Sequence, residues 1–275
     1  MAETSVRGVA DFLASFLAQL GRGSVKGLEA LGFGASLVGD SVYWLVWGRR
    51  RGQTVRLGPI VSEAMEIGIR ALPILTLLSA TIGVMLALQG IYSLREFGAE
   101  SQVTLGVTLG VVREFAPLIT GILVAGRSGS ALAARLATMT IHNEVDALRV
   151  MGVNPVRYIV VPSLVAMLVV VPALALWSDV IALFGAGLYL SAELGMTLSA
   201  FFHETLRSIT VDDVVHGYSK SVLFAILIAV VGTVDGSRVE GGAEGVGRVT
   251  TNAVVHSITA IVLTDMIFVF AATRG

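Results

Sequence analysis

The chain has 275 residues, of which 55% are hydrophobic and only 14% are charged, and its mean hydropathy is +0.82. These values are far from those of a soluble globular domain and indicate an integral membrane protein. The absence of cysteine excludes disulfides, thiol catalysis and metal sites built from thiolates.

Residues 1–65 are predicted to form an N-terminal interfacial segment of amphipathic helices. Residues 28–47 are long enough to cross a bilayer, but Glu29, Asp40 and several glycines favour a helix on the membrane surface, anchored by Trp44 and Trp47. A sixth span is the alternative. Closer to the N-terminus, apolar residues recur at helical spacing and form one stripe, which is typical of a surface helix: Val9, Phe12, Leu13, Phe16, Leu17 and Leu20.

Residues 66–275 are predicted to form the transmembrane domain. A helix needs about 20 apolar residues to cross the hydrocarbon core. The third of the predicted spans exceeds this length, so we expect it to tilt, to kink at Pro162 or Pro172, or to protrude. No alternating barrel pattern occurs, so the predicted fold class is an all-α integral membrane protein with about five transmembrane helices. The predicted spans are Ala71–Tyr92, Val103–Gly126, Tyr158–Leu190, Gly217–Val234 and Val254–Ala272.

Basic residues indicate which loops face the cytoplasm. Eight arginines and lysines precede the first span, and four arginines follow the second, whereas residues 191–213 contain one arginine and four acidic residues. By the positive-inside rule, the first two regions are cytoplasmic and residues 191–213 lie outside. The polar start with Glu3 does not fit a signal peptide, so we expect a cytoplasmic N-terminus.

Arg113 and Glu114 interrupt the second span. Ionisable residues at bilayer depth are costly and are usually functional. Adjacent helical residues point about 100° apart, so each is expected to contact a different neighbour. The pair could be a structural ion pair between helices, or it could line a polar cavity in which Arg113 meets a phosphate and which Lys220 of the fourth span joins. Snorkelling to the outer interface explains Lys220 equally well.

A short amphipathic helix is predicted between Thr140 and Gly152. One apolar stripe runs along it, with His142, Asp146 and Arg149 opposite and Glu144 on the apolar side. It could be a surface connector at the lipid interface, or a coupling helix docked into a groove on a cytoplasmic motor. In the second interpretation the contacting residues are Ile141, Glu144, Val145, Asp146, Leu148 and Met151.

Three weaker patterns offer alternatives. Ser128 lies in a G-x-S-G sequence and His256 in another span, a weak indication of an intramembrane serine protease. Residues 242–249 resemble a phosphate loop but lack its lysine, and we interpret them as a flexible cytoplasmic turn. Asp179 and Asp265 lie in apolar stretches and could form the ion relay of a proton-coupled carrier, or lie at helix ends.

Three sequence runs stand out: Arg113-Glu114-Phe115-Ala116-Pro117, residues 125–131 (AGRSGSA) and residues 146–158 (DALRVMGVNPVRY). Together they resemble the signature of MlaE-type permeases. Further matches are Lys220-Ser221-Val222 and residues 250–255, so the resemblance extends from about Glu63 to the C-terminus. Phe115 and Ala116 depart from the Leu and Gly that the family often has.

This resemblance implies the permease subunit of an ABC transporter that moves phospholipids between the bacterial inner membrane and a periplasmic MCE-domain protein. It implies a homodimer, a cytoplasmic ATPase that binds ATP and Mg²⁺ in place of this chain, and a possible STAS-domain regulator; nucleic acid is not an expected partner. By the same resemblance, residues 140–152 are the coupling helix, and Arg113 and Glu114 face a central lipid cavity.

Overall fold

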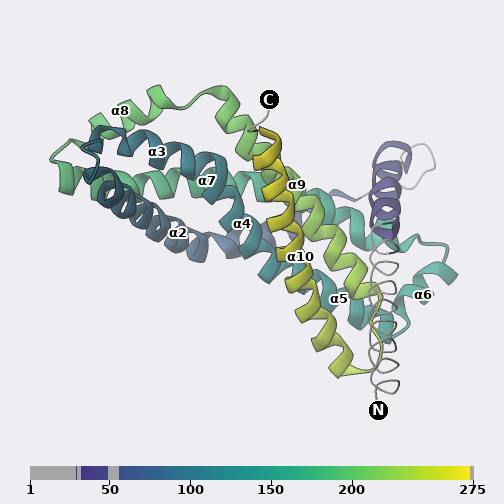
Figure 1. The fold of residues 1–275 in the computed structure, drawn as a ribbon. Helices are drawn as coiled ribbons and strands as arrows, with labels where there is room; N and C mark the ends of the chain where they lie inside the picture. Colours follow the sequence, from purple (N-terminus) through teal and green to yellow (C-terminus); the bar gives the residue numbers. More distant parts are fainter. Residues whose placement is uncertain (1–28, 30–31, 49–55, 273–275) are drawn as a thin grey trace, which may run out of the picture.

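The computed structural model describes residues 29, 32–48 and 56–272, and within these ranges it contains helices and no strands. The predicted all-α fold is confirmed. Residues 32–47 form one helix, and the elements that follow are shown in Figure 1. In chain order they are α2 (Leu57–Arg95), η2 (Glu100–Gln102), α3 (Val103–Gly110), η3 (Val111–Phe115), α4 (Ala116–Val124), η4 (Ala125–Gly129), α5 (Ser130–Ile141), α6 (Glu144–Val150), η5 (Val156–Val160), α7 (Val161–Leu194), α8 (Leu198–Ser208), α9 (Val211–Ser237) and α10 (Ala243–Ala272).

Five helical segments in the described part of the chain are long and apolar enough to cross a membrane, as predicted. Each one is longer than its apolar stretch, because polar turns extend the helices into the interfacial regions. The first and third spans have 39 residues each, or about 58 Å at about 1.5 Å per residue, so they tilt or protrude beyond a core about 30 Å thick. The spans are Leu57–Arg95, Glu100–Ile141, Val156–Leu194, Val211–Ser237 and Ala243–Ala271.

The first and third spans pack side by side and run in the same direction (Figure 1). Two glycines allow the backbones to meet: a Cβ at Gly83 would overlap the carbonyl of Ala182, and one at Gly185 would lie 2.6 Å from the Ala80 oxygen. Near this crossing, the buried hydroxyls of Ser79 and Ser178 are hydrogen-bonded at 2.7 Å. Small residues that permit such close approach are a common basis of helix association in membranes.

Wide π-helical turns interrupt the second and third spans. η3 ends two residues before Pro117, and η5 ends two residues before Pro162. Proline lacks the backbone N–H that would bond the preceding turn and its ring crowds that turn, so the wider geometry accommodates it. No proline closely follows η4; there Ser130, the first residue of α5, donates its hydroxyl to the η4 carbonyls of Gly126 and Arg127.

Ion pairs join the helices at both ends of the bundle. At the end predicted to face the cytoplasm, Arg135 of α5 contacts Glu63 of α2 and donates to Ser163 of α7. At the opposite end, Arg95 bonds Glu100 at 2.8 Å and Glu193 at 3.0 Å. Each group ties together residues from neighbouring spans, which fixes their relative heights.

The helix at 32–47 packs against the transmembrane bundle through one face. A Cβ at Gly34 would lie 2.7 Å from Val230 of α9, and Leu37 is buried. The guanidinium of Arg157 lies over the Trp44 ring at 5.6 Å. Whether this helix lies on the membrane or crosses it stays a prediction. The stripe predicted within residues 9–20 lies outside the described residues.

Candidate functional site

Five ionisable side chains from the second, fourth and fifth spans meet in the half of the bundle that contains α8. We call Arg113, Glu114, Asp213, Lys220 and Asp265 the charged cluster. Lys220 lies nine residues into α9, about 14 Å along the helix axis at about 1.5 Å per residue. Lys220 therefore lies well inside the fourth span, whereas Asp213 lies in the first turn of the same helix.

Lys220 is the centre of one half of the charged cluster. Its side chain has no exposed surface, and Nζ donates to Glu114 Oε2 at 2.5 Å. Nζ also lies 2.9 Å from Asp265 Oδ1, an ion pair without hydrogen-bond geometry. Snorkelling does not account for Lys220, because its ammonium is buried among carboxylates of two other spans. A buried cation with two carboxylates is the kind of matched group that makes burial of charge tolerable.

The other half of the charged cluster joins Arg113 to Asp213. Arg113 Nε and Nη2 both contact Asp213 Oδ1. Asp213 Oδ2 accepts hydrogen bonds from the backbone and hydroxyl of Thr210, at 2.8 and 2.7 Å. Thr210 and Asp213 form the capping box that begins α9, so the acceptor for Arg113 is fixed by the helix start itself.

Arg113 and Glu114 contact different neighbours, as their angular separation predicted. Both belong to the π-helical turn η3. α9 approaches this turn closely at Gly217, where a Cβ would overlap the carbonyl oxygen of Val112. The glycine therefore brings the backbone of α9 within reach of η3, and the side chains on either side of the contact can pair.

The ring of Phe268 on α10 borders the charged cluster. Phe268 lies edge-on to His216 with ring centroids 4.9 Å apart, and Lys220 Nζ is 5.8 Å from the centre of the Phe268 ring. The ring limits access to the buried ammonium and adds a favourable cation–π contact.

The members of the charged cluster differ in exposure. The side chains of Arg113 and Glu114 are 49% and 32% exposed, whereas those of Asp213, Lys220 and Asp265 are 2%, 0% and 15% exposed. One cation and one anion therefore face outward, each backed by a buried group of opposite sign. Such a surface can bind a charged or dipolar ligand group.

Residues 140–152 are two elements, so the prediction of one continuous helix is wrong, while their role in coupling stays a prediction. α5 continues to Ile141, and α6 begins after Asn143, whose φ of 57° is left-handed. Asparagine is one of the few residues other than glycine that adopt this conformation. Thr140 does not cap a helix, because its hydroxyl donates to the Leu136 carbonyl.

The side chains named for coupling have two environments. Ile141, Val145 and Leu148 are partly buried, and Leu148 packs against the bundle core. Glu144, Asp146 and Met151 are exposed. The apolar stripe therefore holds the short helix on the bundle and leaves its acidic first turn free to contact a partner.

A carboxylate beside an apolar stripe, as Glu144 is, usually has a partner. Among the described residues it forms no hydrogen bond or ion pair, whereas Asp146 bonds Arg149 at 3.0 Å. Glu144 is the first residue of α6, a position at which the helix dipole favours a carboxylate.

Within the described residues, no side-chain hydrogen bond or ion pair joins the members of the three weaker patterns to one another. His256 Nδ1 lies 2.8 Å from Asp235 Oδ2, and within the described chain no hydrogen bond joins His256 to Ser128. Residues 243–249 are the start of α10, so the expected flexible turn is largely helical. Asp179 lies inside α7 and not at its end, and no hydrogen bond links it to Asp265; the ion relay stays untested.

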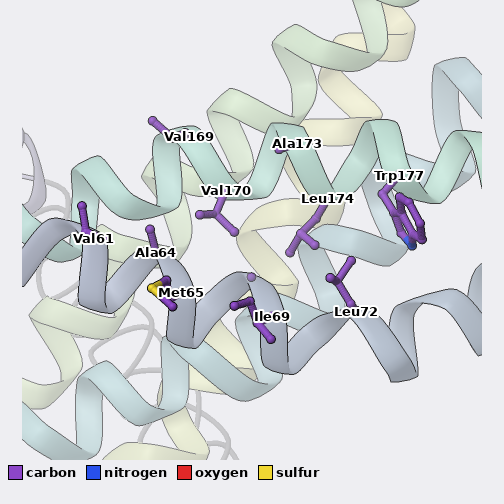
Figure 2. A pocket seen from close by; sticks show the side chains of 11 residues that line it. Val61, Ala64, Met65, Ile69, Leu72, Val169, Val170, Ala173, Leu174 and Trp177 are labelled. Carbon is purple, nitrogen blue, oxygen red and sulfur yellow. The ribbon is translucent and has the colours of Figure 1, made fainter.

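Two grooves lie along α2. The larger has a volume of about 440 Å³ and lies between α2 and α7, with Trp177 at one end (Figure 2). Its lining is apolar apart from the Trp177 indole, whose N–H bonds Thr76 at 2.9 Å. The smaller, about 260 Å³, lies between α2 and α3 and reaches Phe115, the residue after Glu114. Both are suited to hydrocarbon and not to a charged group.

Asp213 is the cluster member that sequence reasoning missed. The sequence places it just before the apolar stretch, among the acidic residues of an outer loop. The spacing Thr-x-x-Asp from Thr210 is the signal that could have shown it to be the third residue of a helix. Its pairing with Arg113 depends on how the helices pack.

Comparison with known proteins gives one consistent family. The family described as "Permease MlaE" matches residues 60–271. A probable ABC transporter permease protein of Rickettsia typhi is 34% identical over 76% of this chain and 81% of its own length. The intermembrane phospholipid transport system permease protein MlaE of Haemophilus influenzae is 28% identical over 93% of this chain and 96% of its own length. A chloroplastic protein of Arabidopsis thaliana, trigalactosyldiacylglycerol 1, is 32% identical over 75% of this chain and 59% of its own length.

Proposed function

Because the chain belongs to the MlaE permease family, we propose that it is the membrane subunit of an ABC transporter that moves phospholipids between the bacterial inner membrane and a periplasmic MCE-domain protein. In this proposal the chain catalyses no covalent reaction. It works as a homodimer with its N-terminus in the cytoplasm, where a separate ATPase binds ATP and Mg²⁺ and can carry a small STAS-domain regulator. The Haemophilus relative aligns over nearly all of this chain, and its name describes a phospholipid transport system, which supports phospholipid as the cargo.

The observation that carries the proposal is the partial exposure of Arg113 and Glu114 within a membrane span. A charged side chain at the centre of a bilayer costs about 2.5–3.5 kcal/mol or more when it faces lipid. These two therefore belong on a surface covered by a second copy of the chain or lining a water-filled cavity. A phospholipid head group is the cargo whose charges fit such a surface.

The fatty-acid chains of the cargo explain why the path must be enclosed. Each buried methylene is worth about 0.8 kcal/mol, so moving two long chains through water would cost well over about 20 kcal/mol. A cavity between two copies, continuous with a tunnel in the periplasmic partner, avoids that exposure. The apolar residues of the bundle offer the chains a surface, while the charged cluster holds the head group.

The exposed acidic turn of α6 offers the ATPase a contact. It lies at the end of the bundle that the basic residues assign to the cytoplasm. Movement of α6 would be passed to the second span through α5, and that span carries Arg113 and Glu114. ATP binding in the partner could thereby change the cavity without any nucleotide site in this chain.

The test is ATP-dependent transfer of phospholipid from vesicles to the MCE-domain partner by the reconstituted complex. Arg113→Ala is expected to reduce transfer at least about tenfold, the scale of one lost charge-assisted hydrogen bond, while the complex still assembles. Arg70→Ala is the matched control, because Arg70 is exposed and pairs only with Glu66 on its own helix. Transfer that requires no ATPase and follows a proton gradient would instead favour a secondary carrier.

A further inference from the structure

The two exposed groups of the charged cluster carry opposite charges on neighbouring residues. Asp213 occupies Nε and one edge of Nη2 of Arg113, which leaves the N–H groups of Nη1 available. Lys220 occupies Oε2 of Glu114, and no hydrogen bond in the described chain engages Oε1. Two consecutive residues of the cluster thus present a free donor that suits a phosphate and a free acceptor that suits an ammonium.

The charges of the cluster do not cancel. Three carboxylates (Glu114, Asp213, Asp265) face two cations (Arg113, Lys220), so one negative charge is in excess when His216 is neutral. A phospholipid whose only charge is its phosphate would add a second negative charge. A head group with both phosphate and ammonium adds none, and its ammonium offsets the excess next to Glu114.

A primary ammonium fits this acceptor better than a quaternary one. An ammonium donates hydrogen bonds to a carboxylate oxygen, and charge-assisted bonds of this kind are among the strongest available. A trimethylated amine has no N–H to donate and is usually recognised by an aromatic cage. The ring of Phe268 lies beside Lys220, whose ammonium already occupies that face.

From this arrangement we infer that the site prefers phospholipids with a primary ammonium beside the phosphate, the class to which phosphatidylethanolamine belongs. Arg113 binds the phosphate and Glu114 the ammonium. The inference rests on the proposed function, and it adds a head-group preference that Glu114 determines.

The experiment measures which lipids remain bound. The complex with its ATPase is placed in bilayer discs made of equal parts phosphatidylethanolamine, phosphatidylglycerol and phosphatidylcholine, and native mass spectrometry identifies the retained lipids. We expect phosphatidylethanolamine to be enriched about tenfold over phosphatidylglycerol, the scale of one charge-assisted hydrogen bond. Glu114→Gln should abolish the enrichment, and Glu114→Asp should keep part of it.

Glu100→Gln is the control, because Glu100 is an exposed carboxylate that pairs with Arg95 outside the charged cluster. Its lipid profile should match the unmodified chain. Equal retention of the three lipids, or enrichment of phosphatidylglycerol, would overturn the head-group inference and leave phospholipid transport intact. Loss of every retained phospholipid together with absence of transfer activity would contradict the proposed function itself. If Glu114→Gln fails to assemble, the comparison of the three lipids on the unmodified chain still decides the inference.

Discussion

The ammonium of Lys220 lies 2.5 Å from the Glu114 carboxylate, across 106 sequence positions, and has no exposed surface. Asp265 approaches the same ammonium from the last span. One cation therefore connects the second, fourth and fifth spans, and its removal leaves two carboxylates facing each other inside the bundle.

Lys220→Met should destabilise the protein by about 3–5 kcal/mol, because it keeps most of the side-chain volume but leaves carboxylates without a cation. The measurement is the free energy of unfolding in mixed micelles. Arg70→Met removes an exposed ion pair within one helix and should change that free energy by less than about 1 kcal/mol. Adding Asp265→Asn to Lys220→Met should restore part of the loss. If Lys220→Met and Arg70→Met changed the free energy of unfolding equally, the buried ion pair would contribute no more to stability than the exposed one.

Glu144→Lys should weaken binding of the ATPase while lowering the stability of the permease by no more than about 1 kcal/mol, the scale of a charge at a helix start. Glu144 is exposed and forms no hydrogen bond or ion pair within the described chain, so the larger effect of its reversal falls on a contact with a partner. The readout is the amount of ATPase that co-purifies, together with the melting temperature. Glu244→Lys is the control, since Glu244 is an exposed carboxylate in the first turn of α10. Unchanged assembly and transport in Glu144→Lys would contradict a coupling role for α6.

Gly83→Ala should cost about 1–3 kcal/mol, because the new methyl group would overlap the carbonyl of Ala182 and force α2 away from α7. Gly106→Ala adds the same group in a helix where nothing lies within 4 Å, and should be neutral or stabilise by up to about 1 kcal/mol. Unfolding free energies of the two variants provide the comparison. A tolerated alanine at position 83 would mean that the two spans are not held at the observed distance.

Hydropathy predicted the five spans because the bilayer imposes length and composition on each helix separately. It missed their polar ends. α10 begins at Ala243, eleven residues before the predicted start, because a helix can continue beyond its apolar stretch into the aqueous region. The divergent pairing of Arg113 and Glu114 also followed from helix geometry alone. The pairing of Arg113 with Asp213 and the contact of Asp265 with Lys220 did not, because both depend on the packing of whole spans.

The coupling segment shows a different limit of pattern reasoning. The apolar residues from Ile141 to Met151 fit one helical stripe, and that periodicity hid the break at Asn143. A single left-handed residue changes the direction of the chain while leaving the apolar residues on one side. Asparagine after a helix end is the local sign of such a break, and it carries more weight than the stripe.

The π-helical turn that contains Arg113 and Glu114 has one residue more than α-helical geometry needs. Tightening it would shift the residues on one side by one position, a rotation of about 100° around the axis. Because both residues belong to this turn, the guanidinium and the carboxylate would rotate together around the helix axis and would exchange their present partners for new ones. A small mechanical input to the second span could in this way release a bound head group without separating any two helices.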